Sequence, residues 1–184
     1  MSHSEAVLGM GGVSRSEAAS TPFRRTLTAG VVTGQVSGLI MAVVVMAVFT
    51  VFLGKGPLFP VQVIGSFAFG DAALEGFHAP AFVAGLLLHQ LGPALFWSVA
   101  FAAAVHVTGL RRGAGMVALA VAAGLASQAL DVNLVLPLAM NALHGHNIWA
   151  EQVPAFWSWA AHLVFGLGLA LYPWIENKLG ARTE

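Results

Sequence analysis

Four long apolar stretches constrain the fold of this chain more than any other feature. They run near Leu27–Leu53, Pro80–Val107, Gly115–Leu138 and Pro154–Ile175, and none of them contains Lys or Arg. A helix needs about 20 residues to cross the hydrocarbon core of a bilayer. Only 9% of the 184 residues are charged, against about 25% in soluble domains. The sequence therefore predicts an all-α integral membrane protein, with a four-helix bundle of spans over residues 23–184.

The distribution of basic residues predicts how this bundle is threaded. Cytoplasmic loops of membrane proteins are enriched in Lys and Arg. Seven of the eight basic residues lie before the first span, between the second and third spans, or after the fourth: Arg15, Arg24, Arg25, Arg111, Arg112, Lys178 and Arg182. Only Lys55 lies on the other side. We therefore expect both termini to be cytoplasmic and the first and third loops to face outward.

A tail and one long loop complete the predicted organisation. Residues 1–22 are rich in Ser, Ala and Gly, and they are predicted to form a flexible cytoplasmic tail. Their apolar run is short and broken by three glycines, so it does not fit a cleavable signal peptide. Residues 54–79 form an unusually apolar outer loop. We expect it to lie in the headgroup region or fold over the bundle, with a short helix capped by Asp71.

Small and aromatic residues in the spans predict packing rather than chemistry. In the first span, three glycines recur at four-residue spacing and share one helix face: Gly30, Gly34 and Gly38. In the third span, three alanines have the same spacing: Ala118, Ala122 and Ala126. We expect these two faces to pack together within the chain, and a dimer contact is the alternative. Four tryptophans near span ends are assigned to an interfacial aromatic belt: Trp149, Trp157, Trp159 and Trp174.

Three ionisable side chains inside the spans carry the main functional hypothesis. His89, Asp131 and His162 lie at similar depths in the outer half of the bilayer, counted at about 1.5 Å per residue. An ionisable group in hydrocarbon is costly and marks a functional site by default. We therefore predict a shared polar cluster. Its predicted further members are Gln128, Ser127 and Ser158. Other polar residues fall on the outer rim of the bundle: His78, His144, His146, Asp71, Glu75 and Glu151.

Several kinds of chemistry are open to this cluster. Two imidazoles from different helices can hold the iron of a b-type haem, with Asp131 orienting one ring. Two histidines and a carboxylate can hold a divalent metal ion. The same groups can also relay protons, hydrogen-bond a quinone or only lock the helices together. Gly92–Pro93 interrupts the second span beside His89. Cysteine is absent, which excludes disulfides, thiolate metal sites and covalently attached haem.

Two terminal segments resemble those of a known group of proteins. The last span carries Phe156–Tyr172, with Trp159 and the run AHLVFG from Ala161, and the first span is rich in Gly and Val with Met41 and Met46. These segments resemble the terminal helices of small, uncharacterised bacterial four-span inner-membrane proteins. The resemblance implies a location in the bacterial inner membrane. It transfers no functional residue.

The leading functional hypothesis is an accessory or assembly subunit of a larger bacterial membrane complex, without catalysis of its own. The spans offer few polar residues for a transport path, and no recognised catalytic motif is present. One alternative is a b-type haem- or metal-binding electron-transfer protein that uses His89 and His162. Another is a small transporter or proton-coupled carrier, although the chain lacks an inverted repeat. The expected partners are lipid and other membrane subunits, and the balance of charges argues against nucleic acid.

Overall fold

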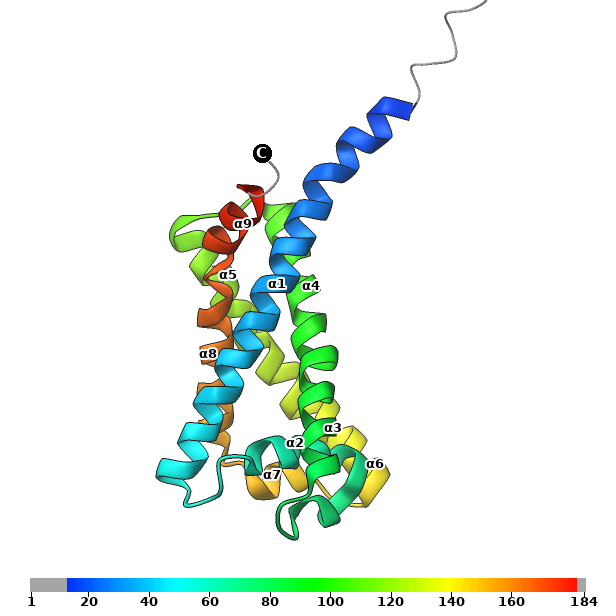
Figure 1. The fold of residues 1–184 in the computed structure, drawn as a ribbon, viewed down its shortest axis with the longest axis vertical. Coiled ribbons are helices and arrows are strands. Elements are labelled where there is room, and N and C mark those ends of the chain that lie inside the picture. The colour runs from blue at the N-terminus through cyan, green and yellow to red at the C-terminus, as the bar shows by residue number, and fades with distance from the viewer. Residues whose placement is uncertain (1–12, 182–184) are drawn as a thin grey trace, which may run out of the picture.

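Long helices dominate the computed structural model, which describes residues 13–181 and the side chains from Phe23 onward (Figure 1). Four helical segments are long and apolar enough to cross a membrane. The first is α1 (Val13–Phe52). The other three are made of consecutive elements: α3 (Ala79–His89), η2 (Gln90–Ala94) and α4 (Leu95–Thr108); α5 (Gly113–Ser127), η3 (Gln128–Val135) and α6 (Leu136–His144); and α8 (Ala155–Leu169) and α9 (Tyr172–Gly180). The protein thus has the all-helical architecture of a multi-pass membrane protein, as the apolar stretches predict.

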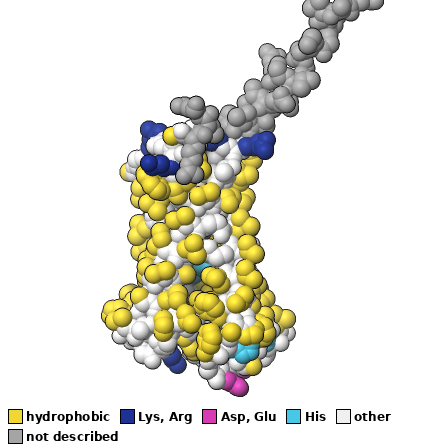
Figure 2. Space-filling model, viewed as in Figure 1, with side chains coloured by type: hydrophobic (Ala, Val, Ile, Leu, Met, Phe, Trp, Pro, Cys, Tyr) yellow, Lys and Arg dark blue, Asp and Glu magenta, His cyan; other side chains and the backbone are white. Residues whose placement is uncertain are grey.

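The four segments alternate in direction, so each end of the bundle has its own character. The described start of α1, the connection between α4 and α5, and α9 share one end, while α2 (Phe59–Phe69), η1 (Gly70–Leu74) and α7 (Ile148–Gln152) lie at the other (Figure 1). Figure 2 shows Lys and Arg side chains gathered at the end that holds α9. Residues 1–12 lie outside the described part, as do the side chains of residues 13–22. The flexible tail therefore stays a prediction.

The predicted outer loop forms a helical layer across one end of the bundle. The helix α2, which lies within residues 54–79, packs closely on α3 of the second span. A side chain at Gly65 would overlap the carbonyl of Ala81, and one at Gly85 would overlap the carbonyl of Val61. We call α2, η1 and α7 the outer layer. The expectation that Asp71 caps a helix is wrong, because its carboxylate accepts a hydrogen bond from His146 instead.

The glycine face of α1 packs against the second span, and the predicted contact with the third span is wrong. A Cβ atom at Gly30 would overlap Ala102, and one at Gly34 would overlap Ser98. The third span packs instead on the fourth, where Gly124 lies against the backbone of Gly166. The spans are apolar on every side, so their sequences do not reveal which face meets which neighbour.

A network of one ion pair and several hydrogen bonds joins the helices at the α9 end. Arg111, between α4 and α5, forms an ion pair with the buried Glu176 of α9. The same guanidinium donates a hydrogen bond of 2.7 Å to Thr26 of α1. The Tyr172 hydroxyl donates to the Glu176 carboxylate at 2.9 Å. This end of the bundle is therefore fixed by charge, whereas a partly open cavity lies toward the opposite end.

Candidate functional site: a histidine-lined cavity

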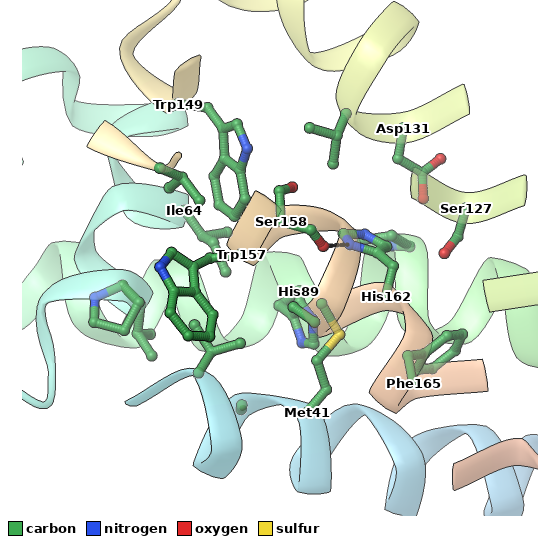
Figure 3. A pocket seen from close by; sticks show the side chains of 18 of the residues that line it. Met41, Ile64, His89, Ser127, Asp131, Trp149, Trp157, Ser158, His162 and Phe165 are labelled. Carbon is green, nitrogen blue, oxygen red and sulfur yellow. Dashed lines mark hydrogen bonds between the residues drawn. The ribbon is translucent and has the colours of Figure 1, made fainter. Parts of the chain in front are cut away.

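A cavity of about 340 Å³ lies between the four spans and the outer layer (Figure 3). Ligand pockets in proteins typically have volumes of about 300–1,000 Å³. Its wall is mostly apolar and draws on every span and on α7, with side chains that include Met41, Phe165, Trp157 and Trp149. His89, Asp131 and His162 all line it. The structure therefore places the three ionisable residues of similar predicted depth around one cavity, although no hydrogen bond joins any two of them.

The geometry of His162 fixes which ring nitrogen carries the proton. His162 is 8% exposed and sits on α8. Its Nδ1 lies 2.9 Å from the backbone carbonyl oxygen of Ser158, one turn earlier (Figure 3). A carbonyl oxygen only accepts hydrogen bonds, so Nδ1 must donate. Burial among apolar side chains makes a charged ring costly, so the ring is neutral and its Nε2 keeps a lone pair.

In His89, too, Nδ1 carries the proton, and here the acceptor is the side-chain amide of Gln90. Nδ1 of His89 lies 3.0 Å from Oε1 of Gln90. The amide orientation of Gln90 is set by its other end, because Nε2 donates to the backbone carbonyl of Gln35 at 3.2 Å. Oε1 therefore faces His89 and accepts the Nδ1 proton. Both cavity histidines thus keep the proton on Nδ1 and the lone pair on Nε2.

Neither Nε2 atom has a hydrogen-bond partner among residues 23–181. Figure 3 shows the His89 and His162 side chains on the wall of the same cavity, with the Met41 sulfur close by. An Nε2 lone pair can bind a metal ion or accept a hydrogen bond from a ligand hydroxyl. The two rings come from different spans, so a ligand between them would bridge the second and fourth spans.

Asp131 is paired with a tryptophan and does not orient either histidine. The Trp97 indole nitrogen donates to its carboxylate at 2.6 Å. The expectation that Asp131 is the acceptor behind a haem-ligating ring is therefore wrong, because Gln90 and the Ser158 carbonyl hold that position. The bond from Trp97 compensates part of the cost of burying a carboxyl group between helices. It also ties the second span to the third.

The other predicted members of the polar cluster bond to their neighbours. The Ser127 hydroxyl donates to the Gly124 carbonyl at 2.7 Å. The Ser158 hydroxyl donates to Oε1 of Gln128 at 2.8 Å. Ser127 and Ser158 line the histidine cavity, while Gln128 faces an adjacent pocket of about 310 Å³ that Asn133 and Asn147 also line. These groups shape the cavity wall without offering it a free donor.

The three outer-rim histidines lie outside the cavity and have structural partners. His78 accepts a hydrogen bond of 3.0 Å from the backbone N–H of Ala81, which caps α3. His144 lies 3.1 Å from the carbonyl oxygen of Phe67 and so joins α6 to α2. In the part of the chain that the structure describes, no group of three His, Asp or Glu residues is arranged to hold a metal ion. The metal-ion alternative therefore lacks a ligand set there.

His146 bridges two carboxylates in the outer layer. Its Nδ1 lies 2.8 Å from Glu151 and its Nε2 lies 3.2 Å from Asp71. Because carboxylates only accept, both ring nitrogens must carry protons, which makes this ring an imidazolium. The hydrogen bond to Glu151 raises the pKa of His146, and Asp71 and the charges of both carboxylates raise it further. The bridge links α7 to η1.

Several cavity residues were not predicted as site residues. Trp149 and Trp157, which we assigned to the interfacial belt, line the cavity, and the buried Nε1 of Trp149 has no hydrogen-bond partner in the described structure. Trp159 and Trp174 are exposed at 40% and 61%, as lipid-facing belt residues would be. Gln35 and Gln90, which lie behind His89 and do not line the cavity, were also missed. Their sequence signal is a carboxamide inside an otherwise apolar span.

Comparisons of the chain with protein-family models, curated proteins and solved structures found no match. The resemblance of the terminal helices therefore stays a prediction. The fold and the cavity define the class that can be stated, an all-helical bundle of four segments long and apolar enough to cross a membrane, with a histidine-lined cavity between them. What the protein does must be argued from the chemistry of that cavity.

Proposed function

We propose that the protein binds haem b in this cavity, where Nε2 of His89 and Nε2 of His162 would hold the iron and the bound haem would supply electron transfer within the membrane. One observation carries the proposal. Two imidazoles from different spans each give the Nδ1 proton to an oxygen acceptor and leave Nε2 free on the wall of one apolar cavity. Metal-ligating histidines characteristically donate their other N–H in this way.

The ligand set favours haem over a bare metal ion. Structural zinc takes about four protein ligands, and the described residues provide no group of even three His, Asp or Glu. A porphyrin supplies four nitrogens to its iron, so two axial histidines complete the coordination. The apolar wall, with Met41 and Phe165, suits the faces of a porphyrin, although no Lys or Arg in the described part of the chain lines the cavity to pair with its propionates. Because cysteine is absent, the haem would be of the non-covalent b type.

The hydrogen-bond donors and acceptors that line the cavity indicate which organic ligand could bind there in place of haem. The donors of Ser127, Ser158 and Trp97 are already bonded. Among the other lining residues of the described structure, Trp149 keeps an unbonded donor, its Nε1. A purely organic ligand would bring O–H donors to the two Nε2 atoms, as a hydroquinone does, and could accept a hydrogen bond from Trp149. Haem and hydroquinone use the same lone pairs, and they are separated by the experiment below.

That experiment is an absorption spectrum of the protein purified in mild detergent, before and after titration with haemin. We expect a Soret band from bis-histidine haem, which His89→Ala and His162→Ala each abolish. His144→Ala removes a histidine outside the cavity and should leave the band intact. A wild-type protein that binds no haem under either condition would contradict the proposal. Saturable hydroquinone binding that requires both histidines would then assign the cavity to that ligand instead.

The same proposal includes a bacterial inner-membrane location with both termini in the cytoplasm. The gathering of basic side chains at the α9 end supports this orientation (Figure 2). The cavity then lies toward the outer side, since α2 and α7 contribute to its wall. Topology reporters fused at either terminus should report the cytoplasm, and one inserted after His144 should report the outside. An external C-terminus would overturn the orientation.

The accessory-subunit hypothesis remains a second candidate, and one observation favours it. In the outer layer and the turn after it, Phe69 is 41% exposed and Phe77 is 67% exposed, beyond the ends of the spans. Exposed aromatic side chains outside the lipid-facing region are typical of protein contact surfaces. The two functions are compatible in a haem-carrying subunit. Mild-detergent purification with a partner inventory tests this, and loss of a co-purifying protein in Phe77→Ser would support it. A protein that purifies alone would contradict it.

A further inference from the structure

We propose that Gln90, held in place by Gln35, is a positioning residue of the cavity site. It keeps the proton of His89 on Nδ1, and so aims the Nε2 lone pair of His89 at the ligand. This inference rests on the proposed use of the cavity as a ligand site. It concerns two residues that do not line the cavity themselves.

The two glutamines form a reciprocal pair between α1 and η2. Gln35 Nε2 donates to the backbone carbonyl of Gln90 at 3.0 Å. Gln90 Nε2 donates to the backbone carbonyl of Gln35 at 3.2 Å and lies 3.3 Å from Oε1 of Gln35. A flipped Gln90 amide would place its oxygen against the Gln35 carbonyl oxygen. The pair therefore allows only the orientation in which Oε1 accepts from His89.

The local backbone makes room for this arrangement. Adjacent side chains on a regular α-helix do not face each other, yet those of His89 and Gln90 do. The contact forms where α3 gives way to the π-helical turn η2, within which Gly92 departs from helical angles. On the facing helix, a Cβ atom at Gly38 would lie 2.5 Å from Oε1 of Gln90. The glycine thus leaves space for the amide that orients His89.

The other cavity histidine provides an internal comparison. His162 donates to the backbone carbonyl of Ser158, which no side-chain substitution removes. His89 depends on a side chain, so its acceptor can be changed by mutation. Acceptors behind a metal-ligating histidine set the basicity of the ring. A residue at position 90 can therefore tune one axial position while the other stays constant.

Imidazole nitrogen NMR of ¹⁵N-histidine-labelled protein in detergent tests the inference without any ligand. The His89 signals are assigned by their absence in His89→Ala. We expect the Nδ1–H tautomer in the wild type, and a proton retained on Nδ1 in Gln90→Glu, which keeps an acceptor oxygen. We expect Gln90→Met to lose it and populate the Nε2–H form. His162 should keep its tautomer in every variant, and Gln128→Met should leave His89 unchanged.

The proposal is overturned if His89 is an Nε2–H tautomer in the wild type, or stays Nδ1–H in Gln90→Met. Should Gln90→Met fail to fold, Gln35→Met takes its place, because it frees the Gln90 amide to rotate and should give a mixture of tautomers. An unchanged Nδ1–H form in Gln35→Met would then contradict the role of the pair.

Haem-loaded protein adds a functional measurement. Gln90→Glu should lower the midpoint potential of the iron, because a carboxylate acceptor makes His89 a stronger donor, and Gln90→Met should raise it. Equal potentials in all three proteins would contradict the positioning role. Failure of the wild type to bind haem would contradict the proposed function alone, since the tautomer measurement needs no haem.

Discussion

The histidines of the cavity and the histidine of the outer layer differ in what their ring nitrogens touch. His89 and His162 each meet one carbonyl-type oxygen and leave one nitrogen free. His146 meets a carboxylate on each nitrogen and is 36% exposed. A ring with one acceptor needs one proton and is neutral, as in His89 and His162. A ring with two carboxylate acceptors needs two protons and is cationic, as in His146. The same residue type thus keeps a free nitrogen lone pair in the first region, and in the second it forms a charged clasp, in which His146 lies between Glu151 and Asp71.

The difference follows from the cost of charge in the two surroundings. Carboxylates beside the cavity histidines would favour imidazolium, which hydrocarbon penalises. Amide and backbone oxygens orient a ring without charging it. The chain does place one carboxylate at this depth, Asp131, but it pairs with the neutral indole of Trp97. At the outer end, the His146 clasp instead joins η1 to α7, where water can solvate all three groups.

The largest expected effect comes from placing a permanent charge in each region. His162→Lys puts an ammonium group on the cavity wall, and we expect it to destabilise the fold by about 3 kcal/mol, the cost of Lys at the centre of a spanning helix. His146→Lys keeps a cation between Asp71 and Glu151 and should leave the stability almost unchanged. Denaturant unfolding of the detergent-solubilised proteins measures both. Equal losses would break the comparison.

Substitutions of two glycines that pack near the cavity histidines should cause smaller losses of stability. In Gly124→Ala, the new methyl group would meet the backbone carbonyl of His162, so α5 and α8 must separate, at a cost of about 1–3 kcal/mol. In Gly38→Ala it meets the end of the flexible Gln90 side chain, which can move aside. We expect Gly38→Ala to shift the His89 tautomer with less loss of stability. Thermal unfolding together with histidine NMR separates the two outcomes, and a greater loss in Gly38→Ala would contradict them.

The smallest effect is the pH dependence of the outer clasp. The folded-state pKa of His146 is raised, so the clasp is complete below the unfolded value of about 6.5 and is lost as the pH rises through the folded value. A neutral ring keeps one proton, and the longer contact, to Asp71, should be the one that breaks. Hydrogen exchange of the α7 amides, corrected for intrinsic rates, should be faster at about pH 9 than at about pH 6.

His146→Gln is the control for this pH dependence, because its amide does not titrate. Exchange in α7 should then be the same at both pH values after correction. The amides of α8 around His162 should show no such change in either protein. A pH response of α7 that persists in His146→Gln would assign the effect to another group.

Sequence reasoning predicted the elements of this fold better than their contacts. The length and polarity of the apolar stretches located all four spans, although the third ends at His144 rather than near Leu138. Counting depth along alternating helices also placed His89, Asp131 and His162 at a level where the structure has one cavity. Depth follows from chain length alone, so it can be read from a sequence.

The rotation of each span about its axis could not be read in the same way. An amphipathic helix reveals its buried face, but these spans are apolar on all sides. The partner of the Gly34 face and the partner of Asp131 were both predicted wrongly for this reason. The role of Gln90 depends further on the local change of helix type at η2, which the neighbouring Gly92–Pro93 marked only as an interruption.

The π-helical turn η2 also changes the direction in which side chains point along the second span, so the residues before it and after it face different neighbours. A regular helix advances about 100° per residue, and a π-type turn holds more residues than an α-helical one, so the residues beyond it are rotated relative to those before it. His89, before the turn, faces the cavity, while Ser98, after it, meets Gly34. Winding Gln90–Ala94 as a regular α-helix of the same length would rotate the later residues by roughly one residue's advance and turn Trp97 away from Asp131. The helix type of this turn is thus part of the site, and Pro93 and Ala94 within it also line the cavity.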